Sequence, residues 1–300
     1  MKTRAVRSVL RSRSTVEGAG VHLKRVLGPH EAHLADPFIL LDDFQSMNPS
    51  DYIAGFPWHP HRGIETATYM VRGTIEHGDN IGNNGMIDSG DVQWMTAGSG
   101  ILHQEMPKPY AGNMQGFQLW VNLPASKKMM EPRYRDIKAE QIPTYPASDG
   151  VDVKIIAGNL NGIRGPVRDL VVDIEYLDVA LEGDREFVHE IDPEYSCIAY
   201  VFEGDGIFSE GKPDRVSHGH VAFFGDGGDI RVKSGKAGAR FLLISGRPIR
   251  EPIAWGGPIV MNRQSELDQA FDELRNGTFI KSDRGSNPKQ LNLSHTHERA

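Results

Sequence analysis

Short apolar runs separated by turns fill the stretch from Glu65 to Met106, and this pattern limits the fold of the chain more than any other feature. The runs ETATYMV, TIEH and DVQWMT are rich in β-branched and aromatic residues. Turn sequences such as RG, GDNIGNNG and SG separate them about every 8–12 residues, a spacing typical of antiparallel strands. No run of useful length has the period of a helix. The stretch therefore predicts an antiparallel meander or a Greek key.

A second block of the same kind follows, with runs such as VVDIEYLDVAL, SCIAYVFEG and ARFLLISG between Gly, Asp and Pro. The segments TYMVRGTIEHGD and AYVFEGDGIFSE, about 130 residues apart, share an apolar strand, a Gly turn and a hairpin return. This weak repeat predicts an all-β fold of two related barrels. We expect the first barrel over residues 1–138, the second over 139–284 and a disordered tail over 285–300, with a polar linker at 129–150.

One segment near the end of the chain has the pattern of a helix. The sequence NRQSELDQAFDELRNG places four apolar side chains on one face, and they are Leu267, Ala270, Phe271 and Leu274. Asn262 or Ser265 can cap its start, and Asn276-Gly277 is a suitable stop. We therefore expect a single short helix after the second barrel.

Charge and cysteine content exclude several classes of protein. The net charge is −7, and no basic stretch interleaved with aromatic residues is present, which disfavours direct binding of DNA or RNA. The single cysteine, Cys197, allows neither an intramolecular disulfide nor a thiolate metal cluster, so we expect a reducing, cytoplasmic location. No apolar run is long enough to span a membrane. The basic N-terminus, MKTRAVRSVLRSRST, is interpreted as an edge strand.

The residues that can carry chemistry are histidines at alternate positions. The pattern His-x-His occurs at 59/61, 218/220 and 295/297. On a strand, residues i and i+2 project from the same face, so two imidazoles can converge on one ion. A metal site then needs a second pair of donors that faces the first.

Only the pair His59 and His61 has such a counterpart. His103 and Glu105 form a second i, i+2 pair after 41 intervening residues, enough for three or four short strands. A barrel can bring both pairs together, pointing inward. Three imidazoles and one carboxylate suit Fe, Mn, Ni, Cu or Zn, and the set resembles that of non-haem iron oxygenases with one extra histidine. The four residues predict a mononuclear metal site with open positions for substrate or O2.

The other histidine pairs lack a facing partner. His218 and His220 are interpreted as turn residues, and the pair at 295/297 lies in the expected tail without a preformed cage. Glu65 follows His61 by four residues and could compete as a ligand, but the Arg62-Gly63 step can break the strand register. We expect Glu65 to contact a histidine ligand and orient its ring, and not to bind the ion itself.

At these residues the sequence resembles the pirin family of the cupin superfamily. The matching text is FPWHPHRGIETATYMVRGTIEHGDNIGNNGMIDSGDVQWMTAGSGILHQEMP at 56–107, GFQLWVNLP at 116–124 and GRPIREPIAWGGPIVMN at 246–262. The resemblance implies a monomer of two cupin (jelly-roll) barrels in which only the first holds metal, through His59, His61, His103 and Glu105. Around Glu65 and Thr96 the chain departs from the general cupin motifs. The resemblance to pirins implies that the carboxylate ligand is instead Glu105, which accounts for this departure.

Some pirin-like proteins are similar to quercetin 2,3-dioxygenases, which open a flavonol with O2 and release carbon monoxide. The resemblance implies one divalent ion, foremost Fe(II), a small aromatic substrate, and Glu105 as the catalytic base that accepts the 3-hydroxyl proton. The alternative is a redox-responsive regulatory protein that binds a transcription factor or a metabolic enzyme. In that case the metal alters a surface and turns nothing over.

Overall fold

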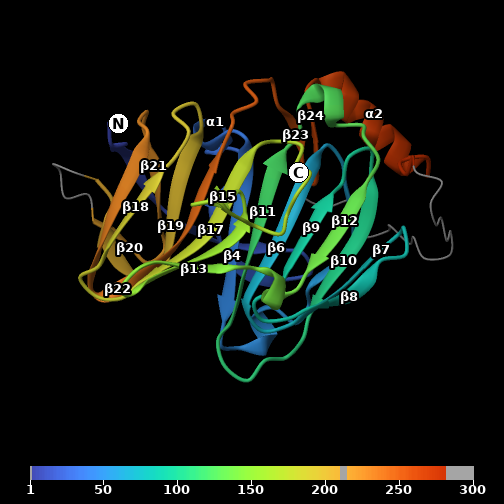
Figure 1. Ribbon diagram of the computed structural model, residues 1–300. Coiled ribbons are helices and arrows are strands. Elements are labelled where there is room, and N and C mark those ends of the chain that lie inside the picture. The colour runs from blue at the N-terminus through green and yellow to red at the C-terminus, as the bar shows by residue number, and fades with distance from the viewer. Residues whose placement is uncertain (1, 210–214, 282–300) are drawn as a thin grey trace. The chain divides into compact units, whose positions relative to one another are not determined.

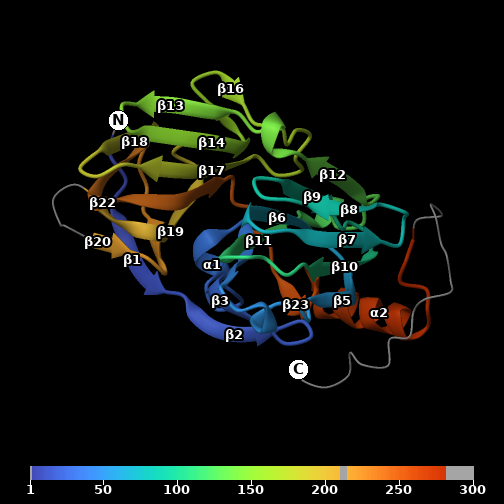
Figure 2. The ribbon, with the colours of Figure 1, turned by 90° about the horizontal axis from the view of Figure 1, so that it is seen from below.

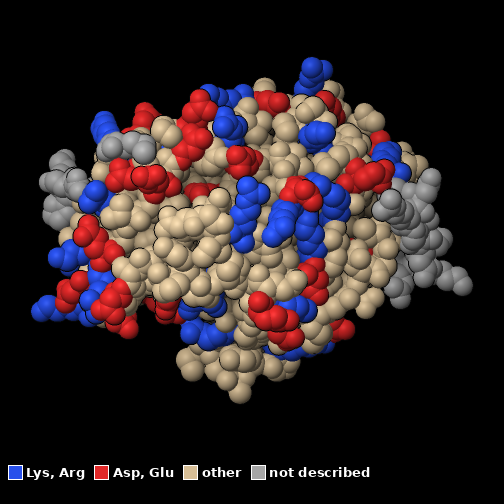
Figure 3. All heavy atoms as spheres, in the orientation of Figure 1, with Lys and Arg blue, Asp and Glu red and all other residues tan. Residues whose placement is uncertain are grey.

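The computed structural model describes residues 2–209 and 215–281, and almost all of its regular structure is strand (Figure 1). The prediction of an all-β fold with one short helix near the end of the chain is confirmed, although a second helix of one turn, α1 (Ala32–Ala35), is also present. None of the described helices is long and apolar enough to cross a membrane. On the face drawn in Figure 3, basic and acidic side chains are interspersed, as expected for a net charge of −7.

The chain forms two compact units, each assembled from three stretches of sequence. The histidine unit, named for His59, His61 and His103, comprises 16–23, 44–136 and, of the C-terminal stretch that the structure describes, 251–281. The second unit comprises 1–15, 24–43 and 137–250. Residues 2–15 thus lie in the second unit and residues 251–281 in the histidine unit, and the expected domains over 1–138 and 139–284 stay a prediction.

The strands between 44 and 136 belong to two sheets. The first has the order β12-β9-β6-β11-β4-β3-β2, and the second has the order β5-β10-β7-β8. The strands are β2 (Arg13–Glu17), β3 (Val21–Leu27), β4 (Phe38–Ser46), β5 (Phe56–His61), β6 (Ile64–Arg72), β7 (Ile75–Asp79), β8 (Asn84–Ile87), β9 (Val92–Thr96), β10 (Ile101–Pro107), β11 (Met114–Asn122) and β12 (Arg133–Ile137). Figure 2 shows β10 lying between β5 and β7.

The order of side chains along β7 and β10 separates an apolar region from a polar one. Ile75 pairs with Pro107, His77 with Glu105, and Asp79 with His103. Ile75 belongs to a buried cluster of apolar side chains, which also contains Val21, Leu23, Phe44, Tyr52, Met70, Ile87 and Met114. Packing therefore fills the barrel beside Ile75 and leaves the histidines among polar neighbours.

The C-terminal stretch completes the histidine unit. The hairpin of β23 (Ala254–Gly256) and β24 (Ile259–Met261) is followed by α2 (Gln264–Arg275), and Leu267 and Ala270 are buried against it. Gly277, at φ +70, ends the helix as expected. The predicted caps are wrong, because Glu266 reaches back and accepts the backbone N–H groups of Asn262 and Arg263 at 3.1 and 3.0 Å.

The second unit contains one large sheet of order β1-β21-β19-β22-β17-β14-β13, to which β18 and β20 are added at the side. Its strands are β1 (Val6–Arg11), β13 (Thr144–Ser148), β14 (Val151–Ala157), β15 (Asn159–Leu160), β16 (Ile163–Arg164), β17 (Ile174–Leu181), β18 (Glu186–Glu190), β19 (Ser196–Ile207), β20 (Arg215–Ser217), β21 (His220–Phe224) and β22 (Asp229–Gly246). Buried aliphatic and aromatic side chains fill its interior. Helix α1 also belongs to it.

Two segments differ in detail from the interpretation of the sequence. The basic N-terminus is an edge strand as predicted, because β1 pairs only with β21 at the end of the sheet order. The linker expected over 129–150 instead contains β12 and β13. Both are the last strands of their sheets, and an edge strand tolerates the polar residues and prolines that concealed them in the sequence.

Candidate metal centre

Three of the four predicted ligands meet at one point. Strands β5 and β10 are antiparallel neighbours in which His103 lies directly opposite His59, and His61 follows His59 on the same face. One ring nitrogen from each of the three imidazoles lies within 4.8 Å of the other two, and within the described residues this is the one such cluster of three or more potential ligands. The spacing argument from the sequence therefore placed these histidines correctly.

Hydrogen bonds orient two of the imidazoles. His59 Nδ1 lies 2.8 Å from the carbonyl oxygen of Pro57, and His61 Nδ1 lies 3.2 Å from that of Pro258. If each Nδ1–H donates to its carbonyl, each Nε2 carries a lone pair, and the two Nε2 atoms are only 3.1 Å apart. Two lone pairs at that distance repel each other unless a cation lies beside them.

His103 supplies the clearest sign that the cluster fits a metal ion. Both of its ring nitrogens are buried and neither has a hydrogen-bond partner. Leaving a buried polar atom unpaired costs about 1–3 kcal/mol, so native proteins rarely tolerate it. A divalent ion bound by the three imidazoles would pair one ring nitrogen of His103 and remove the repulsion between His59 and His61. The donor set is that of a transition-metal site.

The electrostatic environment keeps the imidazoles neutral. Burial lowers the pKa of His59, and burial together with the neighbouring histidines lowers the pKa values of His61 and His103 well below the usual value. Neutral imidazole is the form that binds metal. The indole of Trp120 meets the ring of His61 edge-on, with centroids 5.0 Å apart, and so restricts that ring as well.

Glu105 lies two residues beyond His103 on β10 but is not within the 4.8 Å cluster. A shift in register between the two residues accompanies this placement. Its carboxylate is buried and accepts a hydrogen bond from the Thr68 hydroxyl at 2.6 Å. Burial raises the pKa of Glu105 to about 7. The carboxyl group is therefore suited to exchanging a proton near neutral pH.

Two further polar residues share this interior, and sequence reasoning missed both. His77 lies opposite Glu105 on β7, and its Nε2 is 2.6 Å from the hydroxyl oxygen of Tyr134. Burial raises the pKa of Tyr134, so its hydroxyl remains protonated. The alternation in TIEHGD places His77 on the same strand face as Asp79 and could have revealed it. Tyr134 lies in the segment interpreted as a linker.

A buried lysine secures the corner between β5 and β6. Lys128 is 1% exposed, and its ammonium donates to the carbonyl oxygens of Gly63 and Val260 at 2.8 and 2.9 Å and to Asn122 Oδ1 at 2.6 Å. Gly63 has a φ of +79, and a Cβ there would lie 2.0 Å from the carbonyl oxygen of Val260. This corner directly follows His61.

Arg62 secures the same corner from the other side. Its guanidinium is 2% exposed and donates to the carbonyl oxygens of Ser99 and Phe279 at 2.8 and 2.6 Å and to the Glu273 carboxylate at 2.7 Å. The segment 254–281 thus provides acceptors for His61, Arg62 and Lys128. No local pattern in the sequence predicts this support.

The role expected for Glu65 is wrong. Its buried carboxylate accepts a hydrogen bond from the Thr96 hydroxyl at 2.5 Å and lies 3.8 Å from Arg133, and it contacts none of the three imidazoles. Strand β5 ends at His61 and β6 begins at Ile64, so the break at Arg62-Gly63 turns Glu65 away from the cluster.

The remaining histidine pairs form no site in the described residues. His218 lies in a turn, and His220 begins β21 with its Nδ1 near the carbonyl oxygens of Ser217 and His218. The interpretation as turn residues is confirmed for His218 and is wrong for His220, which is the first residue of a strand. The pair at 295/297 lies outside the described residues.

Comparison with known proteins shows the same organisation in two halves. Residues 20–121 match the family profile described as Pirin, and residues 176–280 match the Pirin C-terminal cupin domain. A pirin-like protein of Caulobacter vibrioides is 44% identical over 93% of this chain and 100% of its own length. The structure of a quercetin 2,3-dioxygenase from Acinetobacter baumannii has a TM-score of 0.86 at 29% identity, covering 93% of this chain and 99% of the other. A bacterial pirin from Escherichia coli in complex with nickel(II) has a similar fold, with a TM-score of 0.60 at 20% identity, over 80% of this chain and 99% of the other.

Proposed function

The chain belongs to the pirin family of two-cupin proteins, and from this premise we propose that it is a mononuclear metal-dependent dioxygenase that opens a flavonol such as quercetin with O2. The observation that carries the proposal is the convergence of three neutral imidazoles, with both nitrogens of His103 unpaired, beside the buried carboxyl group of Glu105. The similarity to the quercetin 2,3-dioxygenase of Acinetobacter baumannii supports the substrate class.

The ligands of the ion are His59, His61 and His103, and Glu105 is proposed as the fourth. Fe(II) is the ion proposed, with Mn, Ni, Cu or Zn as the alternatives. When bound, the ion supplies Lewis acidity that lowers the pKa of the flavonol 3-hydroxyl and prepares the flavonol to react with O2.

Glu105 is proposed as the general base. Its carboxylate accepts the 3-hydroxyl proton, because a base with a pKa near the working pH transfers protons efficiently. Thr68 holds Oε1 of this carboxylate by the 2.6 Å hydrogen bond, and Thr68 in turn lies 2.6 Å from Gln118 Oε1. The carboxyl group is thus oriented before the substrate arrives, which lowers the cost of reaching the reactive geometry.

Incubation of metal-loaded protein with quercetin, with and without air, tests the proposal. We expect loss of the flavonol absorbance together with uptake of O2 and release of carbon monoxide, and no reaction without O2. His61→Ala should abolish both metal content and turnover. His220→Ala, which alters a His-x-His pair outside the cluster, is the matched control and should leave both unchanged.

Glu105→Gln separates proton transfer from metal retention. We expect this variant to keep at least part of its metal and to lose turnover, because the amide cannot accept the proton. Unchanged turnover in Glu105→Gln would exclude the base role. Metal-replete wild-type protein that never consumes the flavonol would refute the dioxygenase proposal and favour a regulatory, metal-containing binding protein.

A further inference from the structure

A cavity of about 360 Å³ lies in the second unit, remote in sequence from the histidine cluster. It is lined by the N-terminal strand β1, helix α1, the start of β19 and the end of β21, together with the stretch from 248 to 250. All of its lining residues belong to this one unit. The volume is within the range of cavities that hold small molecules.

Arg4 is a buried cation in the wall of this cavity. Its side chain is 2% exposed, and its guanidinium donates to the carbonyl oxygens of Tyr195, Gly225 and Asp192 at 2.8, 3.2 and 2.7 Å. Its Nε is buried without a hydrogen-bond partner. The three carbonyl oxygens fix the orientation of the guanidinium but carry no charge that would neutralise it. A buried charge without a counter-ion is costly.

The backbone beside Arg4 makes room for it. A Cβ on Gly227 would lie 2.7 Å from Arg4 Cγ, and a Cβ on Gly225 would lie 2.9 Å from Arg7 Nε. At Gly227 a Cβ would also lie 2.7 Å from the backbone oxygen of Lys2, so glycine there allows Arg4 to approach the strand end, whereas the exposed Arg7 side chain could move away from a Cβ at position 225. The cation is therefore part of the packing of this unit.

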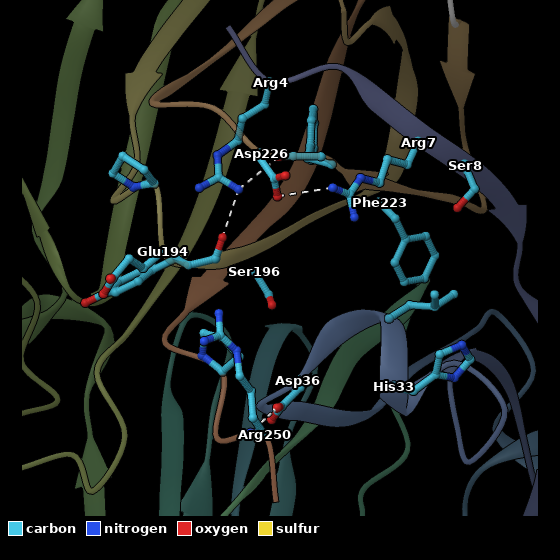
Figure 4. A pocket seen from close by; sticks show the side chains of 16 residues that line it. Arg4, Arg7, Ser8, His33, Asp36, Glu194, Ser196, Phe223, Asp226 and Arg250 are labelled. Atoms are coloured by element: carbon cyan, nitrogen blue, oxygen red, sulfur yellow. Dashed lines mark hydrogen bonds and ion pairs between the residues drawn. The ribbon is translucent and has the colours of Figure 1, made fainter. Parts of the chain in front are cut away.

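Arg250 provides a second cation from the other side of the cavity. Its backbone N–H donates to the carboxylate of Asp36 at 2.6 Å, and its φ of +57 is unusual for a residue other than glycine. The guanidinium of Arg250 has no hydrogen-bond or ion-pair partner in the described part of the chain. Figure 4 shows Arg4 and Arg250 entering from opposite sides, with Ser196 between them.

The carboxylates around the cavity are already engaged. Asp226 pairs with Arg7 at 3.1 Å, and Glu194 pairs with Arg247 at 2.6 Å. The carboxylate of Asp36 accepts the backbone N–H of Arg250, as described above. Neither Arg4 nor the guanidinium of Arg250 therefore has a carboxylate partner, although three acidic residues line the cavity.

We propose that this cavity binds a small organic anion whose carboxylate or phosphate group is attracted by the buried charge of Arg4 and is bound by the exposed guanidinium of Arg250, with the Ser196 hydroxyl as a further donor. Guanidinium groups present paired N–H donors that match either group, and hydrogen bonds between charged partners are about twice as strong as neutral ones. The aromatic rings of Tyr195 and Phe223, which also line the cavity, provide apolar contact for the body of the ligand. The site is separate from the metal centre and independent of the proposed dioxygenase reaction.

Titration calorimetry on the full-length, metal-loaded protein tests this site. The probes are inorganic phosphate and citrate, added at constant ionic strength. We expect saturable binding of at least one probe. Arg250→Gln should weaken that binding by about tenfold or more, because the neutral amide cannot form a charge-assisted, paired hydrogen bond with the anion. Ser196→Ala should weaken it less.

Arg168→Gln is the matched control, since it removes an exposed arginine of the same unit outside this cavity. It should bind the probes like wild type. Preference for phosphate or for citrate would identify the group recognised. Absence of saturable binding up to about 10 mM, far weaker than the micromolar affinities of specific small-molecule sites, would refute the proposal. Equal binding by wild type and Arg250→Gln would also refute it and would indicate non-specific ion association.

Discussion

Replacing Lys128 with methionine removes the buried amino group that holds the corner after His61. Burial lowers the pKa of this amino group to about 7. The methionine chain fills much of the same space, so the substitution deletes the ammonium while largely preserving the packing of the stem. Three acceptors, on Gly63, Asn122 and Val260, lose their donor at once. Because Lys128 is 1% exposed, water cannot easily replace the lost bonds.

The expected cost follows from these contacts. A hydrogen bond to a charged group contributes about 1.5–3 kcal/mol, and the three bonds are not additive because they share one ammonium. The cost of burying the ammonium offsets part of the stabilisation that these hydrogen bonds provide, and the substitution removes this cost as well. We expect a net loss of about 3–5 kcal/mol in the free energy of unfolding, because three buried acceptors lose this donor and a buried acceptor left unpaired costs about 1–3 kcal/mol.

Urea unfolding of the metal-free protein measures this loss, and competition with a chelator measures metal affinity. We expect Lys128→Met to weaken metal binding by about 10–100-fold, the range typical of changes to groups that orient ligands. The physical reason is that Gly63 lies two residues after His61, and Val260 lies two residues after Pro258, the acceptor of His61 Nδ1. A loosened corner no longer holds the imidazole in place.

Lys127→Met is the matched control, because Lys127 is the neighbouring residue and is exposed. It should change the free energy of unfolding by less than about 0.5 kcal/mol. The reasoning would be refuted if both variants unfolded alike. Lower stability of Lys128→Met with unchanged metal affinity would refute only the link between this corner and His61.

Three other perturbations give distinct results. Gly63→Ala should lower the free energy of unfolding in urea by at least about 2 kcal/mol more than Gly82→Ala does. Both glycines have positive φ, but only a Cβ at position 63 would clash with the backbone, at 2.0 Å from the carbonyl oxygen of Val260. His103→Ala should abolish stoichiometric metal binding in elemental analysis, whereas His220→Ala should retain it. Burial alone would raise the pKa of Glu273, but hydrogen bonds from neighbouring side chains lower this pKa to about 2. The ionised Glu273 carboxylate therefore stabilises the folded state above pH 4.5, and this stabilisation is lost as the pH falls toward 2. Glu273→Gln should therefore flatten the decline in stability across that interval, and an unchanged slope would contradict the assignment.

Local patterns in the sequence determined the fold class, the last helix and the three histidines. Strand alternation and turn residues depend only on neighbours in the chain, so ETATYMV and DVQWMT were recognisable as strands. The pairs at 59/61 and 103/105 were recognisable for the same reason, since residues i and i+2 share a face wherever the strand lies. The helix at 264–275 follows from its apolar period.

Only the tertiary structure decided what surrounds those residues. It paired β10 with β7, which placed His77 and Tyr134 in the same interior as Glu105, and it assigned residues 2–15 to the second unit and residues 251–281 to the histidine unit. Lys128 and Pro258 came to support His61 through contacts between residues far apart in sequence. Such contacts have no period and no motif, because they arise from how completed strands pack, and this is why the sequence could specify the clustered histidines but not the residues that hold them.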